Sequence, residues 1–550
     1  MPERTSHPGT WIEGATVYQV YPLSFRDSNG DGWGDLAGVA DGLDHIASLG
    51  VDAIWLSPFY ASPLADFGYD VTDHAAVDPR LGTLEQFDRV IAKAHALGIR
   101  VLLDLVMGHT SDRHPWFEAS RRSQPGDTRI DSKADWYLWA DPAPDGTPPN
   151  NWLSVFGGPA WSWDPRRRQY YLHHFLKQQP SLNLRHPAVI DALMAVVRFW
   201  LARGADGFRI DAVDHLLQDP HYRSNPPVKR PPGAPLPVKL FGLQRHVHDM
   251  LHEDIRPLLE RLRATVDEFP GRVVLGELSS EDGAAERVSR YTEPGGLHGA
   301  YSLRFPKLAF DASQFAAAIR EAAGNPATWW TLSNHDVVRA ASRWHPAGAE
   351  PATFEALLAW LLACLPGTIG LYQGDELGLP EAELGFTELR DPWGIAHWPD
   401  FAGRDGCRTP IPWTPAVPNG GFCPAEVKPW LPVPAEHLAR AVAVQDRRSG
   451  STLQLWRAAL ALRRSRPALA RGTVSDIAAT GPILSFVRAS GTERIHCAFN
   501  LANRPATLRL PSSRLTPLAV ARPPGAAEPA RNGADLALPP LGCCLAAEAD

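Results

Sequence analysis

The sequence has few cysteines, no excess of positive charge and no long apolar run, and each shortage excludes a class of protein. Six cysteines in 550 residues are too few for a disulfide framework. A formal net charge of −7 gives no reason to expect a nucleic-acid partner or binding to an anionic membrane. The longest apolar stretch, Ala356–Leu365, is too short to span a bilayer. The polar residues 1–14 resemble no secretory signal, so we expect a soluble, cytoplasmic protein.

The residues that are plentiful indicate a globular protein with long, ordered loops. Apolar residues make up 44% of the chain and charged residues 21%, which excludes a disordered chain. Proline is abundant at 52 residues, and there are 19 tryptophans and 11 tyrosines. Aromatic rings of this kind often line sugar sites, because they stack on the apolar faces of pyranose rings.

Short apolar segments alternate along the chain with stretches of helical period, such as Leu84–Leu97 and Val189–Ala202. Continuous apolar strands that alternate with helices predict a parallel sheet covered on both faces. Eight such strands predict an α/β fold, a (β/α)8 TIM barrel, rather than an open sheet. The expected strands are Val17–Tyr21, Ala53–Leu56, Val101–Leu105, Gly207–Ile210, Val273–Leu275, Tyr301–Phe305, Trp329–Leu332 and Thr368–Tyr372.

Two parts of the chain depart from this alternation. The stretch between His109 and the strand near Ala205 is too long for a loop of the barrel, so we expect a small inserted domain after the third strand. Beyond about Arg466 the pattern becomes one of alternating strands, which predicts a C-terminal antiparallel β domain. The expected boundaries are 1–109 and 187–466 for the barrel, 110–186 for the inserted domain and 467–550 for the β domain.

The proline-rich stretch 226–239 follows the fourth strand and is stiff. It is either a solvated surface excursion or a loop that lines the functional site.

Acids and bases follow several of the expected strands, where barrels of this kind carry their catalytic groups. Three carboxylates from different strands and one arginine should therefore meet at one mouth, and buried like charges are costly unless chemistry needs them. The polar residues at these strand ends are Asp104 and His109, Arg209 and Asp211, Glu277, and His335 and Asp336.

Two carboxyl groups with separated pKa values are what cleavage of a glycosidic bond requires. One must be ionised to attack, and the other must be protonated to donate to the leaving oxygen. Arg209 lies two residues before Asp211, so both side chains share one face of the strand. The guanidinium group should keep Asp211 ionised, which leaves Glu277 as the acid/base.

The motifs around these residues resemble those of the α-amylase family, glycoside hydrolase family thirteen, and within it the α-glucosidases and oligo-1,6-glucosidases. The resemblance runs from about Thr10 to the end of the chain and is weakest in the last eighty residues. One motif, QPSLN, departs from the family's QPDLN by Ser181. The matching segments are DLVMGH (104–109), GFRIDAVDH (207–215), GE (276–277), NHD (334–336), QPSLN (179–183), AIWLSPFYASPLADFGYD (53–70) and GRDGCRTPIPW (403–413).

The resemblance implies a role for each matching residue. Asp211 corresponds to the nucleophile, Glu277 to the general acid/base and Asp336 to the residue that stabilises the transition state. The substrate-binding residues would be His109, Arg209 and His335 around the glucose ring, Tyr69 as its stacking platform, Phe175 opposite Tyr69, and Asp70 with Arg408 as a pair that closes the pocket at the 4-hydroxyl.

The activity implied is that of a retaining, exo-acting α-glucosidase on small oligosaccharides and other short α-glucosides, with transfer to alcohol or sugar acceptors and no organic cofactor. One alternative is a sucrose- or trehalose-directed glucosyltransferase or isomerase of the same family. A second alternative is a non-catalytic binding homologue, but the three catalytic carboxylates are present. The sequence predicts no oligomeric state.

A polar loop after the first strand has the pattern of a calcium loop. Oxygen-bearing residues alternate around a glycine turn, as in the first half of an EF-hand. An EF-hand needs a glutamate where this loop has Gly38, so the loop is not an EF-hand. It instead resembles the calcium loop of the α-glucosidases, in which the ion would have a structural role. The alternative is an acidic Asn/Gly-rich turn that binds no metal. The expected Ca²⁺ ligands are Asp27, Asn29, Asp31, the carbonyl of Trp33, and Asp35.

Three histidines at 246, 248 and 252 invite a zinc interpretation, because His248 and His252 would share one face of a helix. No third ligand with suitable spacing is evident, and glycoside chemistry based on carboxylates needs no zinc. We therefore expect solvated or sugar-contacting histidines.

Ala212 directly follows the expected nucleophile and should face the acceptor side. In the resembling family, isomaltose-preferring enzymes tend to carry valine here, and maltose-preferring ones alanine or threonine. A stiff, β-branched side chain would fill space that a directly linked α-1,4 pyranose needs. Ala212 therefore favours α-1,4 linkages.

Overall fold

A closed barrel of eight parallel strands forms the centre of this computed structural model, which describes residues 10–127, 129, 132–279, 283–510 and 515–548. The strands follow one another around the barrel in the order β1-β13-β12-β11-β10-β9-β5-β2. The predicted barrel is thereby confirmed. Its strands are β1 (Thr16–Val20), β2 (Ala53–Leu56), β5 (Arg100–Leu105), β9 (Gly207–Ile210), β10 (Val273–Leu278), β11 (Gly299–Ser302), β12 (Thr328–Thr331) and β13 (Thr368–Tyr372).

All eight expected strands are present, but the sixth is displaced. Strand β11 ends at Ser302, where the apolar run predicted a strand that continues to Phe305. A short helix, α8 (Arg304–Lys307), begins there instead. Phe305 packs its ring against Phe315 at 4.7 Å and Trp330 at 5.1 Å between ring centroids. Its apolar character therefore serves packing of the helix on the barrel rather than the strand.

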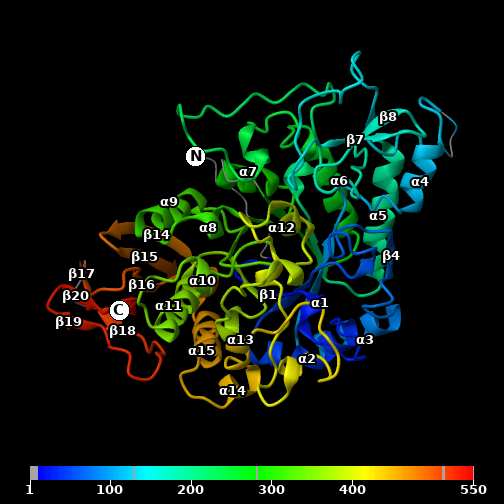
Figure 1. Cartoon of the computed structure of the whole chain (residues 1–550). Helices are drawn as coiled ribbons and strands as arrows, with labels where there is room; N and C mark the ends of the chain where they lie inside the picture. Colours follow the sequence, from blue (N-terminus) through cyan, green and yellow to red (C-terminus); the bar gives the residue numbers. More distant parts are fainter. Residues whose placement is uncertain (1–9, 128, 130–131, 280–282, 511–514, 549–550) are drawn as a thin grey trace.

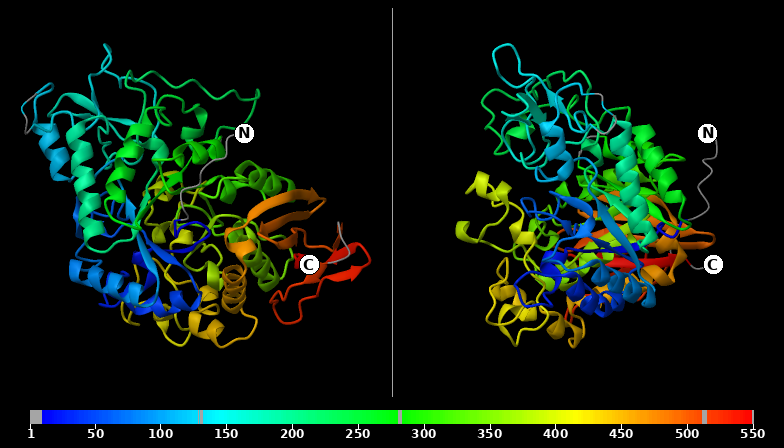
Figure 2. Two further views of the ribbon diagram at one scale, coloured as in Figure 1. Left: turned by 180° about the vertical axis from the view of Figure 1, so that it is seen from behind. Right: turned by 90° about the vertical axis from the view of Figure 1, so that its right-hand side faces the viewer.

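Helices surround the barrel (Figures 1 and 2). Helix α3 begins with a capping box, in which the Thr83 and Gln86 side chains satisfy each other's backbone amides. No helix among the described residues is both long and apolar enough to cross a membrane. The helices are α1 (Pro22–Phe25), α2 (Leu36–Ser48), α3 (Leu84–Ala96), α5 (Pro187–Ala202), α6 (Ile255–Asp267), α7 (Ala284–Tyr291), α9 (Ala312–Ala322), α10 (Ala340–Arg343), α11 (Pro351–Cys364), α12 (Pro392–His397), α13 (Ala435–Leu438), α14 (Val442–Asp446), α15 (Thr452–Ser465) and α16 (Pro467–Arg471).

The segment between β5 and α5 stands apart from the barrel, at the upper right of Figure 1 in cyan. It contains helix α4 (Pro115–Arg122) and a sheet of three strands in the order β6-β8-β7. A smaller pair, β3 (Tyr60–Ala61) with β4 (Asp73–Val77), follows β2. The sheet strands are β6 (Trp139–Ala140), β7 (Trp161–Asp164) and β8 (Gln169–Leu172). The exact domain boundaries stay a prediction.

Two antiparallel sheets form the C-terminal part, coloured orange and red in Figure 1. This confirms the predicted antiparallel architecture. The orders are β14-β15-β16-β21-β18 and β17-β20-β19. The strands are β14 (Thr473–Thr480), β15 (Ile483–Ser490), β16 (Glu493–Asn500), β17 (Ala506–Arg509), β18 (Leu515–Pro517), β19 (Ala530–Asn532), β20 (Asp535–Leu538) and β21 (Cys543–Glu548).

Two buried arginines bind the C-terminal end of α11, and one of them, Arg488, links that helix to the larger C-terminal sheet. Arg463, on α15, donates to the carbonyls of Ala363 and Leu365 at the end of α11, and to that of Leu469. Arg488, on β15, donates to the carbonyl of Cys364 at 2.6 Å. Burial lowers the pKa of Arg463 to about 9 and that of Arg488 to about 10. The guanidinium groups satisfy carbonyls that a helix end leaves without partners.

Candidate active site

A single buried arginine gathers the acidic side chains at the C-terminal end of the barrel. Nη1 of Arg209 donates to Asp104 at 2.6 Å and to Asp211 at 2.9 Å, and Nη2 donates to Glu277. Strand register explains this meeting, since Arg209 lies beside Asp104 of β5 and beside Leu275, two residues before Glu277, on β10. The structure therefore brings the predicted nucleophile and the predicted acid/base onto one guanidinium group.

The two carboxyl groups have different proton affinities. Burial raises the pKa of Asp211 to about 6, although Arg209 opposes the rise. Burial also raises the pKa of Glu277 to about 7, with Arg209 again opposing and Asp211 adding to the rise. Between these values Asp211 is ionised while Glu277 keeps its proton, which is the division of charge that glycoside cleavage needs.

The backbone after Asp211 turns sharply to bring its amide to the acid/base. Ala212 adopts a left-handed conformation, with φ of 42° and ψ of 54°, which residues with a side chain rarely adopt. Its backbone amide donates to Glu277 at 3.2 Å, and the Tyr301 hydroxyl donates to the other carboxyl oxygen at 3.1 Å. Strain of this kind persists where the surrounding structure holds it, often at functional sites.

Asp336 lies among cations and stays ionised. Burial by itself would raise the pKa of Asp336, but the positive charges of Arg404 and Arg408 hold it below its ordinary value. Arg404 donates to Asp336 at 3.1 Å and Arg408 donates to the same oxygen at 2.9 Å. The Asp336 carboxylate is therefore an anion at the pH of the reaction, so it has no proton to donate as an acid.

The residues expected around the glucose ring lie together. The Tyr69 and His335 rings stack with centroids 5.4 Å apart, and the Tyr69 hydroxyl lies 2.6 Å from His335 Nε2. His109 Nε2 lies 3.1 Å from the Tyr69 carbonyl, and Phe175 contacts the His109 ring at 5.3 Å. Burial lowers the pKa of His109 to about 4 and that of His335 to about 3, so both imidazoles are neutral. Their roles in binding stay predictions.

The expected pairing of Asp70 with Arg408 is wrong. Asp70 is fully buried and accepts from the Ser62 hydroxyl and from the amides of Ala65 and Asp66, so it is part of the loop's own structure. Arg408 contacts Asp336 and the His335 carbonyl.

The ion pair in this region is formed instead by Asp66 and Arg404, at 2.8 Å. Each lies four residues before the residue named from the motif, and the linear pattern gave no sign of which aspartate and which arginine would meet. Sequence reasoning missed Asp66 and Arg404, although both lie within the quoted motifs.

The QPSLN segment supports His109 through its backbone. Ser181 forms an isolated bridge with His109, and the Leu182 amide donates to the Gly108 carbonyl at 3.0 Å. The Gln179 side chain reaches His109 Nε2 at 3.1 Å. Since this pairing uses main-chain atoms, serine in place of aspartate at 181 leaves it intact.

The Asp27–Asp35 loop closes on itself through its own hydrogen bonds. Asp27 accepts from the amides of Asn29, Gly30 and Gly32, and Asp35 accepts from Ser28 and from Gly38 at the start of α2. The oxygen donors suit calcium. Within the described ranges, however, no three histidine, cysteine, aspartate or glutamate side chains lie close enough together to hold a metal ion.

The helix expected around His248 and His252 is absent, because residues 244–254 are irregular up to the start of α6. His246 Nδ1 lies 2.7 Å from Asp249 and its ring stacks on Phe241. His252 Nδ1 accepts from the amide of Asp254. These local contacts account for two of the histidines without zinc.

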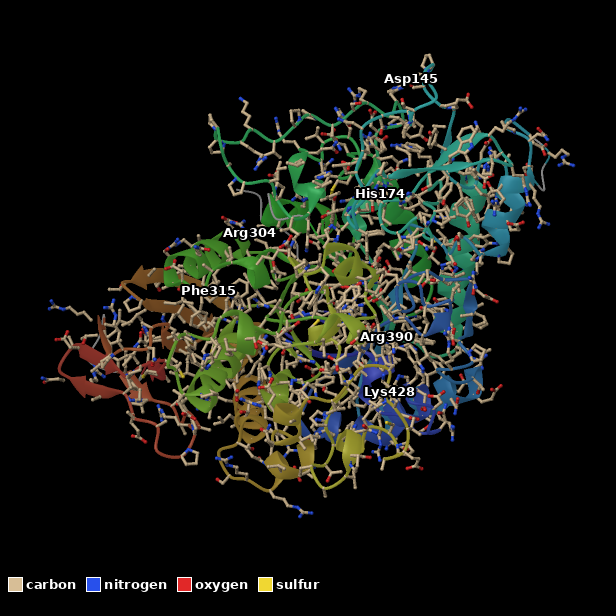
Figure 3. All side chains as sticks on the ribbon, in the orientation of Figure 1. Asp145, His174, Arg304, Phe315, Arg390 and Lys428 are labelled. Carbon is tan, nitrogen blue, oxygen red and sulfur yellow. The ribbon has the colours of Figure 1, made fainter. Side chains whose placement is uncertain are left out.

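The segment after β13 and the inserted segment meet beside this site. Figure 3 labels Arg390 in the first and His174 in the second. Phe156 of the inserted segment contacts the Trp393 ring of α12 at 5.1 Å, and the Arg404 guanidinium lies 5.0 Å from the Phe156 centroid. The site is therefore enclosed on this side by aromatic rings.

Comparisons with known proteins agree with this geometry. The family model described as the α-amylase catalytic domain matches residues 19–472. The chain is 49% identical over 518 residues to a probable α-glucosidase of Rhizobium meliloti (strain 1021), covering 92% of each chain. It is 33% identical to an oligo-1,6-glucosidase of Heyndrickxia coagulans, covering 91% of this chain and 94% of the other.

A solved structure agrees over almost the whole length. The α-glucosyl transfer enzyme XgtA superposes with a TM-score of 0.91 at 46% identity, covering 98% of this chain and all of the other.

Proposed function

Because this chain belongs to the α-amylase family, we propose that it acts as a retaining, exo-acting α-glucosidase that also transfers glucosyl groups. It is a glycoside hydrolase, and the similar proteins are named as α-glucosidases and as an α-glucosyl transfer enzyme. A sucrose- or trehalose-directed activity is less supported by these relatives.

The proposed reaction has two displacements. In the first, the Asp211 carboxylate attacks the anomeric carbon, the glycosidic C–O bond breaks, and Glu277 gives its proton to the leaving oxygen. In the second, Glu277 as carboxylate takes a proton from water or an acceptor hydroxyl, whose oxygen displaces Asp211. Two inversions give net retention of the α anomer.

Asp336 would hydrogen-bond the 2- and 3-hydroxyls of the glucose ring, contacts that strengthen as the ring flattens towards the transition state. The Asp66–Arg404 ion pair at 2.8 Å, rather than Asp70 with Arg408, is our candidate for the closed end of the pocket. A closed end admits only a terminal glucose, which makes the enzyme exo-acting.

The observation that carries the proposal is Arg209, which donates to both Asp211 and Glu277 while burial sets their pKa values near 6 and 7. One guanidinium group that touches both carboxyl groups favours the close spacing of retaining enzymes. Proton NMR during early hydrolysis of maltose tests it. We expect α-glucose first from the transferred unit, and β-glucose first would refute retention.

We propose α-1,4 over α-1,6 linkages, because the Ala212 methyl is small and its backbone is fixed against Glu277 at 3.2 Å. The donors would be maltose-type glucosides.

Alcohols and sugars are the proposed acceptors. Exposed apolar side chains in the loops after β9 and β13 support acceptors with an apolar part; they include Leu236, Val238, Leu240, Phe386, Ile395 and Trp398.

We also propose a structural calcium ion in the Asp27–Asp35 loop, on the strength of its oxygen donors, and a cytoplasmic location. All six cysteines are free, which supports a reducing compartment.

A further inference from the structure

A small cavity lies inside the barrel, where residues of the neighbouring strands β1, β12 and β13 line it. Its volume is about 10 Å³ for the centre of a water molecule, which suits a single water. Gly370 on β13 keeps part of this space open, because a Cβ atom there would lie 2.3 Å from Trp329 Nε1. The cavity therefore depends on a residue without a side chain.

Three side chains that line the cavity carry a buried polar atom without a hydrogen-bond partner among the residues that the structure describes. These atoms are Gln19 Oε1, Trp329 Nε1 and Asn334 Nδ2, and each residue is at most 4% exposed. Trp329 Nε1 can only donate. The Asn334 amide also presents its donor end, because its Oδ1 accepts from the backbone amide of Asp336 at 2.9 Å. One water could accept from both N–H groups and donate to Gln19 Oε1.

Gln19 also reaches the catalytic site, through His335. Its Nε2 lies 2.8 Å from His335 Nδ1 and donates to the Ser57 hydroxyl at 3.1 Å. On the other side of the ring, His335 Nε2 lies 2.6 Å from the Tyr69 hydroxyl and 3.3 Å from Asp336. A tyrosine hydroxyl can donate or accept, so these contacts by themselves allow either tautomer of the neutral imidazole.

The donors around the cavity decide which way the Gln19 amide faces. With the amide turned by half a rotation, its NH₂ group would join the N–H groups of Trp329 and Asn334 around one water. A water accepts from only two donors, so a buried N–H group would stay unsatisfied, which is costly. With Oε1 in the cavity every group has a partner. Gln19 Nε2 then donates to His335 Nδ1, and the ring carries its proton on Nε2.

We propose that Gln19 is a positioning residue that fixes His335 in the Nε2–H tautomer, and that one buried water holds the Gln19 amide in the required orientation. In this tautomer His335 directs an N–H group towards Asp336 and the sugar hydroxyls. In the other tautomer a lone pair of Nε2 would face the Asp336 carboxylate. The use of this N–H group in glucose binding rests on the proposed function, whereas the tautomer itself does not.

NMR spectra of the full chain with ¹⁵N-labelled histidine rings report the tautomer directly. Long-range proton–nitrogen correlations distinguish a protonated ring nitrogen from an unprotonated one, and His335→Asn identifies the His335 signals by their loss. In the wild type we expect a protonated Nε2 and an unprotonated Nδ1. A crystal structure should show one water within about 3 Å of the three cavity atoms. A wild-type ring protonated on Nδ1, or a cavity without that water, would overturn the proposal.

Two variants should change the tautomer by different routes. Gln19→Glu keeps the shape of the side chain, but an ionised carboxylate only accepts, so His335 Nδ1 should become protonated. Trp329→Phe removes one donor from the cavity, so both amide orientations satisfy the water, and the Nδ1-protonated form should become detectable. An Nδ1 that stays unprotonated in Gln19→Glu would refute the role of Gln19. The same result in Trp329→Phe would refute the role of the water.

Ser57→Ala is the matched control. It removes the other acceptor of Gln19 Nε2 but none of the donors around the cavity. The wild-type tautomer should therefore persist. A change of tautomer in Ser57→Ala as large as that in Trp329→Phe would mean that any disturbance of Gln19 suffices, which contradicts the donor count.

Steady-state kinetics connect the tautomer to the reaction. Gln19→Glu should lower kcat/KM for p-nitrophenyl α-glucoside about ten- to a hundredfold, because a hydrogen-bond donor that faces Asp336 and the sugar becomes an acceptor. A reversed tautomer with an unchanged kcat/KM would overturn the positioning role. No nitrophenol release by the wild type would overturn the proposed function, while the NMR result would still decide the tautomer.

Discussion

The pH dependence of kcat/KM should be a narrow bell with its maximum near pH 6.5. Asp211 must be ionised, with a pKa of about 6, and Glu277 must be protonated, with a pKa of about 7. At the maximum about 60% of the enzyme has both groups in the right state. The fraction falls about sevenfold by pH 5, where Asp211 is protonated, and about twentyfold by pH 8.5, where Glu277 is ionised.

Glu277→Gln should remove one limb of that bell. With p-nitrophenyl α-glucoside, whose leaving group needs little protonation, the alkaline limb should vanish while the acid limb of Asp211 remains. With maltose the same variant should lose about a hundred- to ten-thousandfold in kcat/KM, because a sugar alkoxide needs the proton. Steady-state rates from pH 4.5 to 9 measure both.

A second buried glutamate provides the matched control. Burial raises the pKa of Glu381 to about 7 as well, but this carboxylate accepts from the backbone amide of Arg339 outside the catalytic cluster. Glu381→Gln should leave the bell unchanged. An alkaline limb that persists in Glu277→Gln, or equal losses on maltose and the aryl glucoside, would refute the assignment of Glu277 as the acid.

Three further predictions follow from other parts of the molecule. Asp66→Asn should lower kcat/KM for maltose by about ten- to a hundredfold, because Arg404 loses a charged partner; an unchanged kcat/KM would remove Asp66 from the pocket. Ala212→Val should lower the ratio of kcat/KM for maltose to that for isomaltose by about fivefold or more. Ala212→Gly is the control, because glycine tolerates the φ of 42° without filling space. If Ala212→Val leaves the ratio unchanged, the steric argument is wrong. A chelator should lower the Tm without changing the kcat of the folded enzyme, because calcium in the Asp27–Asp35 loop would stabilise by mass action; a metal-free protein with an unchanged Tm would show that the loop is only a turn.

The barrel and its acidic centre could be predicted because both follow from the regular alternation of short apolar strands with helices along the sequence. Parallel strands buried on both faces are short apolar runs, and a side chain just after such a run lies at the mouth. That reasoning placed Asp211, Glu277 and Arg209 at one mouth without any contact being known. The same reasoning failed at Phe305, because this apolar residue lies in helix α8 and not in the predicted strand.

The closed end of the pocket could not be predicted in the same way. Asp66 and Arg404 lie in irregular loops, where no period relates a residue's number to the direction of its side chain. The alternatives four residues on, Asp70 and Arg408, have the same chemistry. Only the folded structure shows that the Asp70 carboxylate accepts hydrogen bonds from backbone amides, whereas the Asp66 carboxylate pairs with Arg404.

The buried guanidinium of Arg463 has a consequence for anyone who recombines this enzyme with its relatives. It binds carbonyls of Ala363 and Leu365 before the expected boundary at 466/467, and that of Leu469 beyond it. A chimera joined at that boundary would unite helices that have not evolved together around one buried cation. Crossover points should therefore keep α11, α15 and α16 in a single parental block, since an unmatched carbonyl there leaves a charge without a partner.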